Sequence, residues 1–252
     1  MPRTLGVLLI LSLALGLTFA EITPLALRKA GSLCAKGSKS LADGDVDKAS
    51  QAFEEALKAV PDYPDAHIGL GDVALRGKNF EGALREYQAA REGIVKLGDL
   101  MKAREMEQQR SNQQAADSLR DQSAYASSPG VKSGAASLTT TLGAKEAQAR
   151  DAATKTVDNK SDVRIPAELY YKIGNVQFML RRADEARESW ESCIKSDPKF
   201  GRAYGNLAIV EFQAGHLDKA QEYVNEAEKL GASVNPNLKN DLAKALASRP
   251  KP

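Results

Sequence analysis

The sequence predicts an all-α fold built from paired helices that repeat along the chain, and three observations support this prediction. Among the 252 residues, aromatic residues make up only 6% and charged residues 27%, with Ala abundant, which favours helices over strands. Similar residues recur 34 positions apart in two parts of the chain, as in repeat proteins. Each recurring unit carries a small residue, an Ala twelve positions later and a bulky residue four positions further on.

Residues 1–20 are predicted to be a secretory signal peptide. Arg3 precedes an uncharged, Leu-rich run that ends in small residues at Ala20, where a signal peptidase would cleave. The alternative is an uncleaved membrane anchor, although the apolar run is shorter than the ~20 residues that a spanning helix needs. Cleavage would make the protein exported, either periplasmic or extracellular.

An N-terminal pair of repeats is predicted within residues 21–97, as units 30–63 and 64–97. The 34-residue shift aligns small with small, Ala with Ala and bulky with bulky residues: Gly37 with Gly71, Ala49 with Ala83, and Phe53 with Tyr87. The small residue and the Ala allow two antiparallel helices to approach closely. The bulky residue lies one helical turn after the Ala and therefore on the same face.

The middle of the chain lacks this pattern. Residues 98–122 are charged and Gln-rich, and we expect them to extend the preceding helix. Residues 123–164 are rich in Ser, Thr, Ala, Gly and Lys with few large apolar side chains, so they cannot bury enough surface to offset chain entropy. We expect this stretch to be a flexible linker or inserted loop.

A C-terminal pair of repeats is predicted within residues 165–234, as units 167–200 and 201–234. Its key positions are Gly174, Ala186, Trp190 and Ala220. Residues 235–252 follow as a capping helix and tail, because terminal repeats need a polar outer face. Gly44 and Gly215 mark the turn between the two helices of their units.

This pattern resembles the tetratricopeptide repeat (TPR) family, whose hairpins stack into an α-solenoid. The resemblance implies a protein-binding scaffold in which the first helices of successive repeats line a concave groove. Carried onto this sequence, the expected peptide groove comprises Tyr171, Lys172, Asn175, Phe178, Arg202, Asn206 and Ile209. Asn175 and Asn206 match the two Asn with which chaperone-binding members hold a peptide. Tyr171 stands where those members have Lys, so a receptor for chaperone tails is not expected.

Two arrangements of the repeats are compatible with the sequence. The pairs are either separate units on a tether or one array in which residues 123–164 loop out and unit 64–97 stacks on unit 167–200. About three stacked repeats are usually needed for stability, which favours either a single array or two pairs that are each capped by an extra helix. Of these, we favour the capped pairs, joined in one elongated body.

No constellation of residues indicates catalysis. Cys34, His67, Cys193 and His216 show no zinc-ligand spacing, and the chain has no phosphate-binding loop and no G-x-S-x-G sequence. We expect no cofactor, metal or small-molecule substrate, and we expect both cysteines to be buried free thiols. The net charge of +2 argues against a nucleic-acid partner.

The sequence therefore predicts an exported, non-catalytic scaffold that binds other proteins. We expect it to hold a peptide or a partner helix in the concave groove and to act in assembly of the cell envelope. The alternative is a non-catalytic accessory subunit of an envelope enzyme or of a secretion complex. Contact with a membrane is expected only if the N-terminal segment stays uncleaved.

Overall fold

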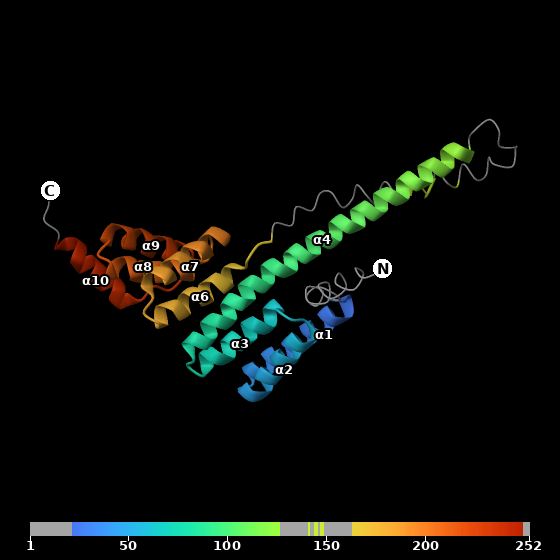
Figure 1. Ribbon diagram of the computed structural model, residues 1–252. Helices are drawn as coiled ribbons and strands as arrows, with labels where there is room; N and C mark the ends of the chain where they lie inside the picture. The colour runs from blue at the N-terminus through green and yellow to red at the C-terminus, as the bar shows by residue number, and fades with distance from the viewer. Residues whose placement is uncertain (1–21, 127–140, 142–143, 146, 149–162, 249–252) are drawn as a thin grey trace, which may run out of the picture. The chain divides into compact units, whose positions relative to one another are not determined.

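The structure is a computed structural model that describes residues 22–126, 141, 144–145, 147–148 and 163–248. These residues form helices and contain no strand (Figure 1), which confirms the predicted all-α fold. The helices are α1 (Pro24–Ala42), α2 (Val46–Ala59), α3 (Pro64–Arg76), α4 (Phe80–Ala126), α6 (Ala167–Met179), α7 (Ala183–Ser196), α8 (Gly201–Gln213), α9 (Leu217–Lys229) and α10 (Pro236–Ala247).

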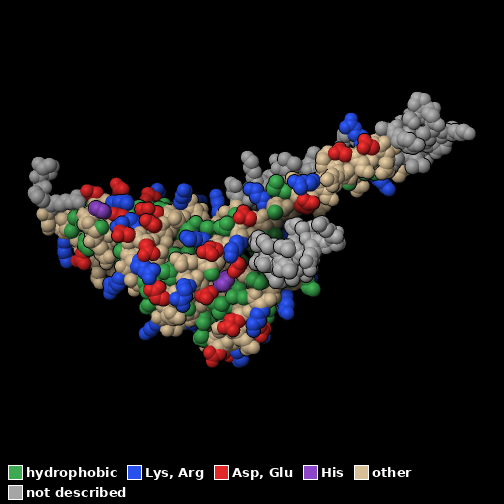
Figure 2. Space-filling view, viewed as in Figure 1, with side chains coloured by type: hydrophobic (Ala, Val, Ile, Leu, Met, Phe, Trp, Pro, Cys, Tyr) green, Lys and Arg blue, Asp and Glu red, His purple; other side chains and the backbone are tan. Residues whose placement is uncertain are grey.

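The chain divides into two compact units. The described residues of 1–94 and 165–252 form the first unit, and those of 95–164 form the second. The first unit contains the helical hairpins α1–α2, α6–α7 and α8–α9, and a further hairpin made by α3 and the beginning of α4. On the visible face of this unit, acidic and basic side chains are interspersed (Figure 2), as the small net charge implies.

The turn inside each hairpin places one residue at the same point of the repeat in the left-handed region. These residues are Gly44, Lys78, Arg181 and Gly215, with φ of 87°, 58°, 63° and 80°. Glycine adopts this conformation without strain, whereas a side chain makes it costly. The first and last hairpins therefore turn at glycine, and the two inner hairpins turn at a strained cation.

Small residues on the first helix of a hairpin make room for a bulky side chain on the second. A Cβ added to Gly71 would lie 2.4 Å from the Tyr87 ring, and one added to Gly174 would lie 2.6 Å from Nε1 of Trp190. The repeat positions taken from the sequence are all buried: Gly37, Ala49, Phe53, Gly71, Ala83, Tyr87, Gly174, Ala186, Trp190 and Ala220.

The second and third hairpins pack directly against each other. Leu84 and Tyr87 of α4 share a buried cluster with Leu169 and Ile173 of α6. Two ion pairs join the same hairpins, Lys172 with Asp72 and Arg182 with Glu81. The four hairpins thus form one array in which unit 64–97 stacks on unit 167–200, in place of the separately capped pairs that we favoured. The single array is favoured because the aromatic and aliphatic side chains of α4 and α6 bury each other.

The last hairpin is covered by α10. Leu238 and Leu242 of α10 are buried in a cluster with Val224 and Ala227 of α9. The outer side of α10 carries exposed polar residues such as Lys239 and Asp241. This arrangement ends the array with a polar surface.

The middle of the chain is described in part. The segment 98–122 is helical and belongs to α4, which continues to Ala126. Of the expected linker 123–164, the structure describes residues 123–126 within α4, the helical residues 141, 144–145 and 147–148, and residues 163–164. The remainder of that segment and the expected signal peptide 1–20 lie outside the described residues. Among the helices described, none has the length and apolar character that a bilayer-crossing segment requires.

Candidate functional site

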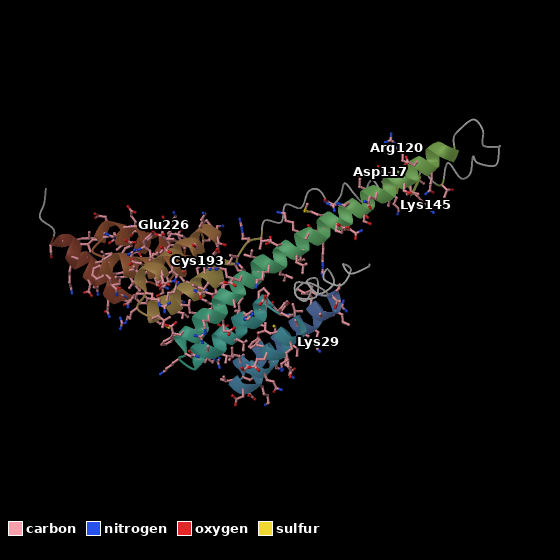
Figure 3. All side chains as sticks on the ribbon, in the orientation of Figure 1. Lys29, Asp117, Arg120, Lys145, Cys193 and Glu226 are labelled. Atoms are coloured by element: carbon pink, nitrogen blue, oxygen red, sulfur yellow. The ribbon has the colours of Figure 1, made fainter. Side chains whose placement is uncertain are left out.

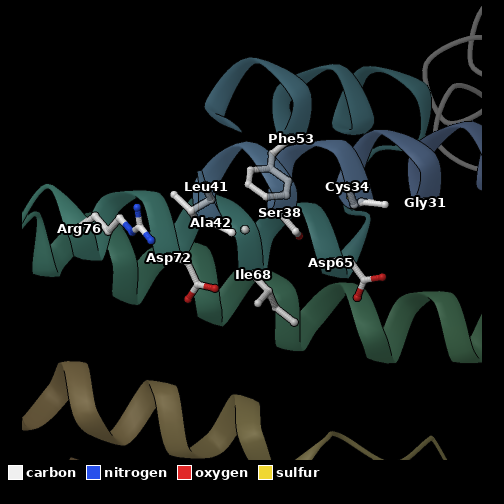
Figure 4. A pocket seen from close by; sticks show the side chains of 12 residues that line it. Gly31, Cys34, Ser38, Leu41, Ala42, Phe53, Asp65, Ile68, Asp72 and Arg76 are labelled. Atoms are coloured by element: carbon white, nitrogen blue, oxygen red, sulfur yellow. The ribbon is translucent and has the colours of Figure 1, made fainter. Parts of the chain in front are cut away.

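The candidate site is a pocket of about 600 Å³ in the N-terminal pair of hairpins. Two helices form its sides and Phe53 of α2 contributes its floor (Figure 4). On both helices the lining residues recur at intervals of three or four, so each helix presents a single face to the pocket. The lining residues are Gly31, Cys34, Ala35, Ser38, Leu41 and Ala42 of α1, and Asp65, Ile68, Gly69, Asp72 and Arg76 of α3.

The pocket exists because the α1 side chains that line it are mostly small. The equivalent positions of the third hairpin, 137 residues further along the chain, hold larger groups. Cys34 corresponds to Tyr171, and Ser38 corresponds to Asn175. The small residues of α1 therefore leave open a volume that larger side chains occupy in the third hairpin.

The floor of the pocket is fixed by a ring held between two glycines. Phe53 is 1% exposed. A Cβ on Gly37 of α1 would lie 2.7 Å from this ring, and one on Gly69 of α3 would lie 2.3 Å from it. The ring thus touches the backbones of both helices that line the pocket. The sequence pattern identified Gly37 but not Gly69, which lies in the following repeat.

The charges that line the pocket all come from α3. Asp72 accepts a hydrogen bond from the Tyr87 hydroxyl at 2.6 Å and pairs with Lys172 of α6. Burial, together with this bond to Asp72, raises the pKa of Tyr87, so the hydroxyl stays protonated and donates. The Lys172 ammonium also lies 5.6 Å from the centre of the Tyr87 ring. Asp72 therefore ties the pocket wall to the third hairpin.

The groove residues predicted in the C-terminal pair contact one another. The side-chain oxygen of Asn175 accepts hydrogen bonds from Asn206 Nδ2 at 2.8 Å and from Trp190 Nε1 at 3.2 Å. The Phe178 ring lies 5.7 Å from the Trp190 ring. The oxygen of Asn175 is thus already used inside the protein.

Arg202 lies over Tyr171, another of the predicted groove residues. Its guanidinium lies 4.8 Å from the centre of the Tyr171 ring and 4.9 Å from that of Phe200. It also donates to Glu168 at 2.8 Å. Lys172 is engaged with Asp72, and Ile209 is half-buried against the core that α8 and α9 share. Peptide binding by these seven residues stays a prediction.

A buried acid that the sequence pattern did not single out lies in the last hairpin. Glu211 is 1% exposed and is surrounded by His216 Nδ1 at 2.7 Å, Lys219 Nζ at 3.1 Å and Arg187 Nε at 3.0 Å. Arg187 Nε lacks the alignment of a hydrogen bond. Burial raises the pKa of Glu211, but the hydrogen bonds from His216 and Lys219 outweigh burial and hold it below its usual value.

A signal for this buried acid exists in the sequence. Glu211 occupies the same repeat position as Gln177, one helical turn after a core residue in each case. Gln177 is also buried and is bonded to Ser189 and Glu185. A polar residue that recurs on the core-facing stripe therefore indicates a buried polar network.

The two cysteines are buried free thiols. Cys34 borders the pocket, and Cys193 lies on α7 within the array (Figure 3). Burial and the nearby Asp65 carboxylate raise the pKa of Cys34 to about 11. Burial and Glu168 raise the pKa of Cys193 to about 12. Both thiols are therefore protonated at neutral pH, and neither is an activated nucleophile.

The two histidines contact different carboxylates. Nδ1 of His67 lies 2.8 Å from a carboxylate oxygen of Glu86, and His216 belongs to the Glu211 network. In the part of the chain that the structure describes, no three His, Cys, Asp or Glu side chains are grouped so that they would hold a metal ion. The pocket itself is lined by apolar side chains, one serine and three charged residues.

The chain was compared with curated proteins and with solved structures. No curated protein matches the sequence. Matching solved structures include PilF of Pseudomonas aeruginosa, with 16% identity, coverage of 89% of this chain and 87% of that chain, and a TM-score of 0.42. The type IV pilus biogenesis factor PilW matches with 15% identity, 86% coverage of each chain and a TM-score of 0.44. A thermophilic TPR protein of Thermus thermophilus matches with 20% identity, 86% and 99% coverage, and a TM-score of 0.37.

A family model described as tetratricopeptide repeat matches residues 34–94 and 171–235, which together make up half of the sequence. The first match extends from α1 into α4, and the second extends from α6 to the residue before α10. Each match covers one pair of stacked hairpins, and each pair carries the small, Ala and bulky positions that close a hairpin. The chain therefore belongs to the tetratricopeptide repeat family.

Proposed function

We propose that this protein is an exported scaffold that binds a peptide segment of another protein in the pocket between α1 and α3. Tetratricopeptide repeat proteins generally bind other proteins. The observation that supports this site is the open volume of about 600 Å³ between two first helices of adjacent hairpins. The corresponding face of the C-terminal pair is filled by its own side chains, as the bonds from Trp190 and Asn206 to Asn175 illustrate.

The chemistry of the pocket fits a peptide. Its floor is apolar at Phe53, and each of its two walls has an apolar residue, Leu41 on α1 and Ile68 on α3, which would accept an aliphatic side chain. Ser38, Asp65 and Arg76 border it with groups that donate and accept hydrogen bonds. Specific sites of this size commonly combine an apolar surface with a few placed polar groups.

Export is proposed on the residues of the N-terminus alone. Arg3, the uncharged run and the small residues ending at Ala20 form the pattern that a signal peptidase recognises. Mass spectrometry of the protein purified from its own organism should find Glu21 as the first residue. A chain that retains residues 1–20 would contradict cleavage.

Blocking the pocket tests the binding site. Ser38 is exposed and lines the pocket, so Ser38→Trp would fill it without disturbing the core. Ser32→Trp is the matched control, because Ser32 is exposed on α1 and does not line the pocket. Proteins captured by the wild type and by Ser32→Trp, but lost with Ser38→Trp, would identify the partner. Equal capture by all three forms would contradict this site.

A further inference from the structure

Two charged side chains that line the pocket have no partner among the described residues. Of the three charged residues that line it, Asp72 is engaged with Tyr87 and Lys172. Within the described residues, Asp65 and Arg76 form neither an ion pair nor a hydrogen bond through their side chains. Both belong to α3, and the α1 residues that line the pocket are uncharged. Among the residues that the structure describes, the pocket therefore offers an occupant one carboxylate and one guanidinium that no other side chain engages.

These two charges lie at opposite ends of the pocket. Asp65 is in the first turn of α3 and Arg76 is its last residue. Figure 4 shows them on either side of Ile68 and Asp72. They are eleven positions apart in the helix, which is roughly 16 Å along its axis. An extended peptide covers that distance in about five residues, at ~3.3 Å per residue.

We propose that the occupant is an extended peptide with a basic side chain beside Asp65 and a carboxylate beside Arg76, about five residues apart. An apolar side chain between them would contact Phe53, Leu41 or Ile68. This inference rests on the proposed function and specifies its ligand. Arginine suits the carboxylate end, because its planar guanidinium binds a carboxylate with two parallel hydrogen bonds. The two fixed charges also set the direction in which the peptide lies.

Both charges also have a role that needs no ligand. An anion near the start of a helix and a cation near its end stabilise the helix dipole. That role predicts a lower melting temperature when either charge is removed, with no change in what the protein binds. A test must therefore measure peptide selectivity as well as stability.

A displayed library of random dodecapeptides provides the probe. The full chain should enrich peptides with Lys or Arg and Asp or Glu about five positions apart, relative to selection on Ser38→Trp. The Arg76→Glu form should enrich peptides with two basic residues at that spacing. Circular dichroism on each form checks that it remains folded.

Synthetic copies of an enriched peptide are then used to measure how much each charge contributes to binding affinity. Replacing the basic residue of the peptide with Gln should weaken its binding to the wild-type protein about two- to five-fold, as for a partly exposed ion pair. The same peptide substitution should not change binding to the Asp65→Asn protein. A second peptide carries its carboxylate at a free C-terminus instead of on a side chain, and its amidated form is the control. Comparing these peptides shows whether Arg76 binds a side-chain carboxylate or a C-terminal one. Raising the salt concentration should weaken binding to the wild type more than to the double variant Asp65→Asn/Arg76→Gln.

The outcomes separate the two proposals. Enrichment over Ser38→Trp without the charge pattern would overturn this inference and leave the proposed function intact. The same peptides selected by the wild type and by Arg76→Glu would overturn it too. No enrichment over Ser38→Trp would overturn the proposed site, and this inference with it.

Discussion

The N-terminal and C-terminal pairs of hairpins differ in what covers the face shared by their first helices. The α1 side chains that face α3 are mostly small, and a pocket remains open above Phe53. On α6 and α8 the same face carries larger side chains, with Arg202 lying over the Tyr171 ring and Asn175 bonded to Trp190 and Asn206. The positions that close each hairpin are similar in both pairs. Those positions therefore determine the fold, and the exposed positions of the first helices determine where a ligand fits.

The two pairs also differ in their buried polar residues. At the eleventh position of its repeat, the third hairpin has Gln177 and the last has Glu211, whereas the second has Ala74. The C-terminal pair thus contains a buried charge that needs partners, and the second hairpin has an apolar contact at that position. Stability should consequently depend on pH in the last hairpin through a residue that has no counterpart in the second.

The largest expected effect comes from the ring that closes the third hairpin. Trp190 is 2% exposed and touches Gly174, Phe178 and Asn175. Trp190→Ala should lower the free energy of unfolding by about 3–5 kcal/mol, measured by urea denaturation of the full chain. Glu188→Ala on the exposed side of α7 is the control and should change it by less than about 0.5 kcal/mol. Similar losses for both would contradict the repeat register.

The next effect concerns the buried acid of the last hairpin. Glu211→Gln keeps the side-chain volume and reproduces the residue found at the equivalent position, Gln177. It should cost about 1.5–3 kcal/mol at neutral pH, because Lys219 and His216 lose a charged acceptor.

The pH dependence follows from the lowered pKa of Glu211. The stability that this residue contributes is present above its ordinary pKa of about 4.5 and is lost as the pH falls through the lowered value in the folded state. Urea midpoints measured from pH 7 to pH 3 should therefore converge for the wild type and Glu211→Gln at the acid end. A constant difference across that range would show that Glu211 does not titrate with unfolding.

A smaller effect compares one glycine from each pair. Gly69→Ala would place a Cβ 2.3 Å from the Phe53 ring, which Gly37 already confines from the other side. Overpacking costs about 1–3 kcal/mol and Ala returns up to ~1 kcal/mol of helix propensity, so the net loss should be about 1–2 kcal/mol. Gly205→Ala in α8 meets nothing within 4 Å and should stabilise the protein by up to ~1 kcal/mol. Thermal denaturation measures both, and a gain at Gly69 would mean that Phe53 can move.

The hairpins were predictable because a period of 34 residues aligns the residues that must touch within a repeat. Gly37 and Phe53 illustrate this, since both belong to one unit and their contact follows from helical spacing. Gly69 was missed because it meets Phe53 from the next repeat. The spacing within a unit carries no information on how the neighbouring unit is rotated against it.

The candidate site was harder to predict than the fold. Asn175 has the right residue type and position for holding a peptide, but Trp190 and Asn206 occupy its oxygen. Which hydrogen bonds a surface amide makes depends on side chains from two other helices. The pocket over Phe53 arises from small residues, and a run of small residues in a sequence equally indicates close helix packing.

The smallest expected effect tests how the C-terminal face is held closed. Arg202 donates to Glu168 and lies over the rings of Tyr171 and Phe200. Arg182 makes an ion pair of the same 2.8 Å length with Glu81. Among the described residues, its guanidinium lies over no aromatic ring. Arg202→Ala should therefore cost about 0.5–1 kcal/mol, since a cation over a ring adds to an exposed ion pair. Arg182→Ala should cost less than about 0.5 kcal/mol.

Urea denaturation at low and high salt separates the contribution of the ion pairs from that of the ring contacts. Salt screens the exposed ion pairs, so at high salt Arg202→Ala should show the larger remaining loss of stability. Equal losses for the two variants at every salt concentration would show that the rings add nothing. The C-terminal face would then be held closed by Asn175 and Asn206 rather than by the cover that Arg202 provides.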